Sequence, residues 1–266
     1  MTHPNTQSMI QPYTKVSDTS LHMPERVLLG EQTMASLFAN IVYVYRHHFR
    51  VIFFCSALPM LPLLLLLEVL KVTEPIVQLL GLVLYYMGIF IVSGALTVAL
   101  SDICLGNRPT VRRSYARILG GNRWLLLIST GLLLMLAMTL GMLLLILPGL
   151  WLIVRTFFTS IIVALEDRGN WDAIRRSIAL TKGQAWRISG LFLPIYLLIM
   201  VFVIPLIIVP SMLPAMAASV FTFLGGFVLA ATLTPASLLA LVLLYYDQRV
   251  RREAYDAQAL SEDLMR

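Results

Sequence analysis

Short amphipathic segments and long apolar stretches alternate along this chain, and the alternation occurs three times. The amphipathic segments 34–50, 110–123 and 170–187 each end in an arginine, and each is followed by apolar sequence. The longest stretch without a charged residue, 188–246, is too long for one membrane-spanning helix, which needs about 20 residues, and fits two with a turn. The pattern predicts three repeats, each an interfacial helix followed by a hairpin of two membrane-spanning helices.

Prolines mark the turns within the apolar stretches. Pro210 and Pro214 divide the longest one, and Leu147-Pro148-Gly149 divides the one before it, because proline lacks the backbone donor that a continuing helix needs. The stretches are continuously apolar rather than alternating, which favours helices over a β-barrel. We therefore expect an all-α polytopic membrane protein with six transmembrane helices at 50–69, 76–101, 124–146, 150–166, 187–209 and 218–246.

The amphipathic segments have the spacing of helices that lie at a membrane surface. In 34–45 the apolar side chains recur every three or four residues, which places them on one helical face. Thr110 and Asn170 are the expected N-caps of the second and third segments. We expect these three helices to form a collar around one end of the six-helix bundle.

Composition supports this division of the chain. Hydrophobic residues make up 59% of the sequence and charged residues 13%, whereas soluble domains carry about 25% charged residues. Residues 1–24 are polar and lack the apolar centre of a cleavable signal peptide, so we expect a disordered cytoplasmic tail. Residues 25–247 form the expected membrane domain, and 248–266 a cytoplasmic C-terminal helix or tail.

Nearly all of the 20 lysines and arginines fall on one side of the expected topology. The positive-inside rule then places both termini and the collar in the cytoplasm, with short and nearly uncharged connections outside. This orientation predicts a protein of the bacterial inner membrane. The net charge of +6 is explained by helix ends that meet anionic lipid headgroups, so we expect no nucleic-acid binding.

Arginines near the span ends are the candidate binding residues. They either anchor the helices among anionic headgroups or form a docking surface for lipid or protein, and the sequence leaves both interpretations open. The residues are Arg46, Arg50, Arg112, Arg113, Arg117, Arg123, Arg175, Arg176, Arg187 and Arg249.

Arg155 is the one charged residue well inside an expected span. Charges within a bilayer are costly and usually face protein or water. We therefore expect Arg155 either to face the bundle and pair with Glu68, with Gln78 as a further partner, or to extend unpaired to the outer interface.

The sequence offers little for catalysis or cofactor binding. The spans carry no Asp, Glu, Lys or His at mid-span, where ion-coupled transporters place such groups. No HExxH, GxSxG or P-loop motif occurs. Glu166, Asp167 and Asp172 interleave with arginines, which favours local ion pairs over a carboxylate site. We expect no enzyme activity, no metal and no cofactor.

Several short stretches resemble one known family. They are Leu147–Arg155, Ala164–Arg168, Ala173–Gly183, Trp186-Arg187, Thr234-Pro235 and Leu244–Glu253. They are similar to the membrane domain found beside bacterial glycerophosphodiester phosphodiesterases and to related stand-alone inner-membrane proteins. The resemblance implies a six-helix membrane domain. It does not imply phosphodiesterase activity, because that hydrolase is a separate soluble barrel of about 250 residues, for which this chain has no room.

Three functions remain, in order of preference. The first is a non-enzymatic accessory or scaffold protein that binds anionic lipid, a partner membrane protein or a second copy of the chain through the basic collar. The second is a permease or channel-like protein for a lipidic or neutral solute, which needs no buried charge. The third is a membrane enzyme that acts at the headgroup level through Glu166, Asp167 or Asp172.

Overall fold

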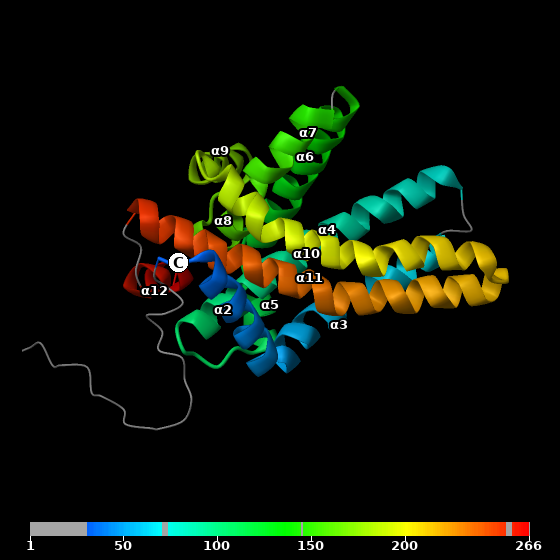
Figure 1. The fold of residues 1–266 in the computed structure, drawn as a ribbon, viewed down its shortest axis with the longest axis horizontal. Coiled ribbons are helices and arrows are strands. Elements are labelled where there is room, and N and C mark those ends of the chain that lie inside the picture. Colours follow the sequence, from blue (N-terminus) through cyan, green and yellow to red (C-terminus); the bar gives the residue numbers. More distant parts are fainter. Residues whose placement is uncertain (1–30, 71–73, 145, 254–256, 266) are drawn as a thin grey trace, which may run out of the picture.

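The computed structural model describes residues 31–70, 74–144, 146–253 and 257–265, and every regular element in these ranges is helical (Figure 1). The expected all-α fold is confirmed for this part of the chain, and the expected tail 1–24 lies outside it. The elements are α2 (Met34–His47), α3 (Phe49–Leu70), α4 (Pro75–Cys104), α5 (Val111–Leu119), α6 (Arg123–Leu144), α7 (Ile146–Thr156), α8 (Thr159–Glu166), α9 (Asn170–Thr181), α10 (Ala185–Ile208), η1 (Val209–Met212), α11 (Ala215–Glu253) and α12 (Ala257–Met265).

Five helices are long and apolar enough to cross a membrane: α3, α4, α6, α10 and α11. They coincide with five of the expected spans to within a few residues, except that α11 continues to Glu253. The expected turn at 210–214 is present, because the short 3-10 helix η1 connects α10 to α11 there. Such a set of helices is typical of an integral membrane protein.

The expected fourth span, 150–166, is wrong as one continuous helix. The chain forms α7 and α8 instead, with a turn at Phe157 and Phe158 between them. The turn is tolerated because Phe158 is fully buried in protein, and α8 packs against α4, α6 and α9. Pro148 does not mark a turn either: it lies in the first turn of α7, where a missing backbone donor costs little.

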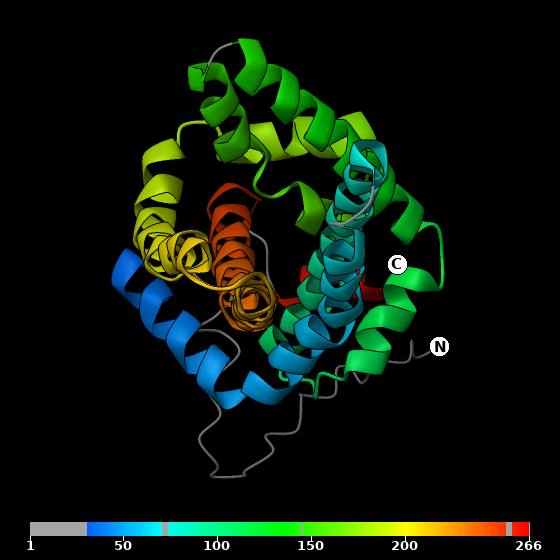
Figure 2. The same ribbon diagram turned by 90° about the vertical axis from the view of Figure 1, so that its right-hand side faces the viewer.

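The helices α2, α5 and α9, which we call the collar, lie at one end of the molecule, where the hairpins α3–α4, α6–α7 and α10–α11 begin and end (Figure 1). In the end-on view of Figure 2, the α3–α4 and α6–α7 hairpins lie on different sides of α11. Thr110 caps α5 as expected, since its side chain accepts a hydrogen bond from the Arg113 N–H. The expected cap Asn170 is wrong, because α9 starts at Asn170 and its N-cap is Gly169.

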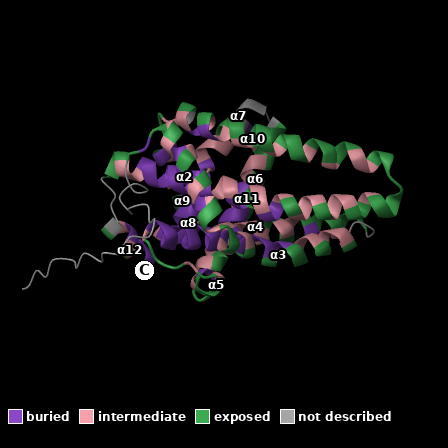
Figure 3. Cartoon of the chain, turned by 60° about the horizontal axis from the view of Figure 1, so that its bottom comes forward, coloured by how far each residue is buried: buried purple, intermediate pink, exposed green. Residues whose placement is uncertain are grey.

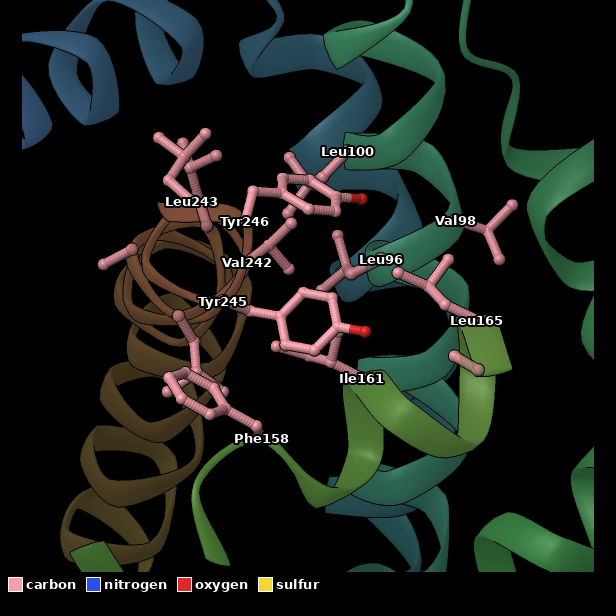
Figure 4. Packing of buried hydrophobic residues seen from close by; sticks show 14 of the residues in the cluster. Leu96, Val98, Leu100, Phe158, Ile161, Leu165, Val242, Leu243, Tyr245 and Tyr246 are labelled. Carbon is pink, nitrogen blue, oxygen red and sulfur yellow. The ribbon is translucent and has the colours of Figure 1, made fainter. Parts of the chain in front are cut away.

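The buried core is concentrated at the collar end (Figure 3). It combines the last turns of α4, all of α8 except Ser160 and Glu166, and residues 239–248 of α11. Figure 4 shows Tyr245 and Tyr246 of α11 between Phe158 and the leucines of α4, all of them buried. In contrast, the most apolar stretch of α10 has no buried residue. The outer halves of the hairpins therefore present apolar side chains to their surroundings, as lipid-facing helices do.

Candidate functional site in the collar

The structure separates the expected binding arginines into two groups. Four of them make no ion pair with another described residue and are exposed: Arg46, Arg50, Arg112 and Arg175. The other six are held by protein groups, either acidic side chains or, for Arg117, a backbone carbonyl: Arg113, Arg117, Arg123, Arg176, Arg187 and Arg249. From the sequence alone, all ten arginines belonged to a single group of candidate binding residues.

Glu166, the last residue of α8, is the centre of one ion-pair network. Its nearly buried carboxylate accepts hydrogen bonds from Arg176 Nε at 3.1 and 3.2 Å and from Tyr245 Oη at 2.8 Å. Arg176 and Arg249 both donate to Glu253, at 2.8 and 3.0 Å. A buried carboxylate is costly unless it is paired and hydrogen-bonded. The network therefore joins α8, α9 and α11, which is a structural use of Glu166.

Asp247 of α11 is the centre of a second network and is fully buried. It accepts hydrogen bonds from Arg187 Nε and Arg251 Nε, both at 3.1 Å, and from the Gln32 N–H at 2.8 Å. Both arginines also donate to the Gln32 carbonyl. These contacts fix the entry of the chain into α2 against the first turn of α10. The spacing of Asp247 and Arg251, four residues apart on one helix, is the one signal in the sequence that pointed to this pair.

The C-terminal helix α12 is docked on the collar end. Leu260 and Leu264 are buried in the core, and α12 contacts α4 and α8. Asp263 accepts a hydrogen bond from Arg249 Nη1 at 2.8 Å, and its backbone carbonyl accepts one from Arg117 Nη2 at 2.8 Å. Asp263 thus holds two of the candidate arginines, Arg249 through its carboxylate and Arg117 through its backbone carbonyl.

The surroundings of two collar arginines shift their pKa values in opposite directions. Burial, followed by the charge of Arg123, lowers the pKa of Arg117. Burial also acts to lower the pKa of Arg176, but hydrogen bonding to Glu253 and the charge of Glu166 outweigh it and raise that pKa. Arg117 is therefore a partly buried guanidinium beside Arg123, whereas Arg176 lies between the carboxylates of Glu166 and Glu253.

Collar side chains also satisfy backbone groups where the long helices are interrupted. Pro59 cannot donate to the carbonyl of Cys55, four residues earlier in α3, and Tyr115 of α5 donates to that carbonyl at 2.8 Å. Tyr45 of α2 donates to the carbonyl of Thr232 in α11 at 2.9 Å, next to the Ala231 carbonyl that Pro235 leaves without its helical donor.

Ser177 of α9 bridges the break between α7 and α8. It donates to the Arg155 carbonyl at 2.8 Å and accepts from the Phe158 N–H at 3.3 Å. Each collar helix thus donates a hydroxyl hydrogen bond to a backbone carbonyl at or beside a proline or a break in a long apolar segment. Unpaired backbone groups are costly away from water, so these contacts explain why the interruptions are stable.

The structure does not bring Arg155 and Glu68 together. Both residues are described, and no ion pair joins them. Arg155 lies in the last turn of α7, next to α9, with its guanidinium 5.3 Å from the ring centre of Trp151. Glu68 lies in the last turn of α3, at the end far from the collar. The expected partners are therefore at different levels of the bundle.

All four tryptophans are exposed. Three of them lie at helix starts on the collar side: Trp124 of α6, Trp171 of α9 and Trp186 of α10, which is 91% exposed. Tryptophan is enriched at the membrane–water interface, where its ring lies at the headgroup level. The exposed arginines and these rings therefore occupy the same end of the molecule.

Comparisons of the chain with protein-family models, with curated proteins and with solved structures gave no match. The resemblance described above is therefore still a prediction. The candidate site rests on the geometry and chemistry of the described residues.

Proposed function

We propose that this chain is a non-enzymatic accessory protein of the bacterial inner membrane that binds anionic lipid through exposed arginines of the collar and of the start of α3, with the collar on the cytoplasmic side. The division of the arginines carries the proposal. The paired arginines already have protein partners, whereas Arg46, Arg50, Arg112 and Arg175 are exposed, have no acidic partner among the described residues and belong to four different helices.

Lipid fits this distribution better than one protein partner. Arg46 and Arg50 are close together in the chain, whereas Arg112 and Arg175 come from α5 and α9, so the four charges do not belong to one helix. Each basic residue near an anionic membrane surface contributes about 1 kcal/mol. Exposed tryptophans at the same end support a position at the headgroup level.

The carboxylates considered for catalysis support a structural role. Glu166 is engaged by Arg176 and Tyr245, and Asp167 pairs with Arg123 at 3.3 Å. Asp172 is exposed and separate from them. Among the described residues, no group of three His, Cys, Asp or Glu side chains could hold a metal ion.

The test is lipid retention measured by native mass spectrometry. The full chain is reconstituted in nanodiscs that contain equal amounts of phosphatidylglycerol and phosphatidylcholine, and the lipids that remain bound after release are counted. We expect the wild type to retain phosphatidylglycerol preferentially. Changing Arg46, Arg50, Arg112 and Arg175 to Gln should abolish the preference, because it removes four unpaired charges.

The matched control changes the same four residues to Lys. It keeps the charge and should keep most of the preference for phosphatidylglycerol. Equal retention of both lipids by the wild type would overturn the proposal, as would an unchanged preference in the Gln variant. A stoichiometric protein that remains bound in place of lipid would instead favour the docking of a partner.

A further inference from the structure

A groove of about 610 Å³ lies between the outer parts of α10 and α11. The two helices run side by side there (Figure 1). Nearly all of its lining side chains are apolar, and Leu224 and Val228, which are more than half exposed, form part of it. Gly225 lies on the groove where α10 and α11 come close, since a Cβ at this position would overlap the Leu206 side chain. The groove is thus open to the lipid phase and cannot offer a hydrogen-bonded site to a polar solute.

The length of the groove matches one leaflet of a bilayer. Its lining runs along α11 from Phe221 to Leu233, which corresponds to about 18 Å at a rise of about 1.5 Å per residue. The hydrocarbon core of a bilayer is about 30 Å thick, so one leaflet is about 15 Å. An acyl chain that starts at the headgroup level would therefore fill the groove along its length.

One end of the groove lies at the collar. Thr232 lines the groove, and its carbonyl accepts the hydrogen bond from Tyr45 in the last turn of α2. The next residue is Arg46, and Arg50 follows at the start of α3. Both arginines are exposed and have no ion pair with another described residue. Two exposed arginines thus closely follow, along the chain, the α2 residue that contacts this end of the groove.

We propose that this groove and the two arginines form one phospholipid site. One acyl chain lies between α10 and α11, and the phosphate of an anionic headgroup lies on Arg46 and Arg50. The inference rests on the proposed function and places one bound anionic lipid in the groove between α10 and α11. A phosphate source without an acyl chain would leave the apolar groove unused, so the occupant is a membrane phospholipid.

The experiment fills the groove and leaves the arginines in place. Val228→Trp puts a large side chain into the groove at an exposed position, so the helix packing is not disturbed. Val201→Trp is the matched control, because Val201 is also exposed on this hairpin but does not line the groove. Both variants and Arg46→Gln/Arg50→Gln are placed in phosphatidylglycerol nanodiscs, and native mass spectrometry follows the last lipid that is released.

We expect the wild type and Val201→Trp to hold one phosphatidylglycerol longest. Val228→Trp and the double arginine variant should each lower its occupancy at least tenfold. If only the arginine variant loses the lipid, the result supports headgroup binding by the arginines and refutes acyl-chain binding in the groove. If Val201→Trp loses it equally, or if inorganic phosphate displaces it, the site is wrong. A dimer that Val228→Trp dissociates would assign the groove to a second copy and overturn the inference.

Discussion

The same kinds of residues have different surroundings at the two ends of this molecule. At the collar end, residues 239–248 of α11 are buried in protein, and Tyr245, Tyr246 and Asp247 among them form hydrogen bonds to other helices or to the segment before α2. At the outer end, Ile207 and Met216 are 70% and 85% exposed, and the hydroxyls of Ser211 and Thr222 donate only to carbonyls three or four residues earlier in the chain. Apolar side chains are enclosed by protein at one end and left for lipid at the other.

This difference separates the part of the molecule that determines stability from the parts that are available for binding. Burial in protein and paired charges occur together at the collar end, so changes there should unfold the protein. Exposed apolar residues at the outer end lose little when they are shortened, because lipid or detergent covers them in either case. The exposed arginines belong to the collar end by position, but they form no ion pair with another residue that the structure describes.

The largest effect is expected from Asp247→Asn. The change leaves Arg187 and Arg251 without their shared buried carboxylate, and breaking a buried ion pair costs about 3–5 kcal/mol. Thermal unfolding in a mild detergent measures the loss of stability. The control Asp172→Asn, at an exposed acid on α9, should change little. Equal effects of the two changes would mean that the Asp247 network does not hold the collar end together.

Two leucines of α4 test the difference between the collar end and the outer end within one helix. Leu100 is fully buried at the collar end, and Leu80 is 58% exposed near the outer end. Leu100→Ala should cost about 2–5 kcal/mol through the lost contacts and the cavity, whereas Leu80→Ala should cost less than about 1 kcal/mol. The midpoint of thermal unfolding distinguishes them. A larger loss for Leu80→Ala would show that the outer end is packed against something absent from the isolated chain.

A smaller effect is expected from Ser177→Ala. It removes the hydroxyl that serves the Arg155 carbonyl and the Phe158 N–H, and leaving buried polar groups unpaired costs about 1–3 kcal/mol. Ser211→Ala is the matched change at the outer end, because the Ser211 hydroxyl makes one exposed contact with the Ile208 carbonyl. Hydrogen exchange at residues 157–160 should rise only in Ser177→Ala. No difference between the two variants would remove the proposed support of the α7–α8 break.

The smallest effect on stability is expected from changing Arg46, Arg50, Arg112 and Arg175 to Gln. Surface substitutions that break no contact usually change stability by less than about 0.5 kcal/mol each. The unfolding midpoint in neutral detergent should therefore stay close to that of the wild type, while lipid retention changes as described above. A large drop in neutral detergent would show that these arginines do support the fold.

Much of the architecture follows from local sequence pattern. The apolar runs predicted five of the long helices, and Thr110 predicted the start of α5, because both depend on residues close together in the chain. The break between α7 and α8 was not predictable in the same way. Residues 150–166 carry only two charges, Arg155 and Glu166, and nothing local marks a break; the turn is stable because Ser177 and the surrounding helices enclose it.

The same distinction between local sequence pattern and tertiary contacts applies to the candidate site. The sequence located the arginines near the helix ends, but it could not separate Arg176 or Arg249 from Arg46 or Arg175, since all of them occur in similar basic surroundings. Their partners are distant in sequence: Arg187 meets Asp247, and Arg117 meets the carbonyl of Asp263. A long-range pair leaves no local pattern, so the separation into paired and exposed arginines appears only in the folded molecule.

By itself, the sequence determined that the chain is helical, that it is apolar enough for a membrane and that its basic residues gather at the helix ends. These properties arise from hydrophobicity and from residue spacing within single segments. Only the tertiary structure decided which charges are neutralised, where a long apolar segment breaks and where a groove lies between α10 and α11. Those features depend on which helices meet, because burial and ion pairing act between segments far apart in the chain.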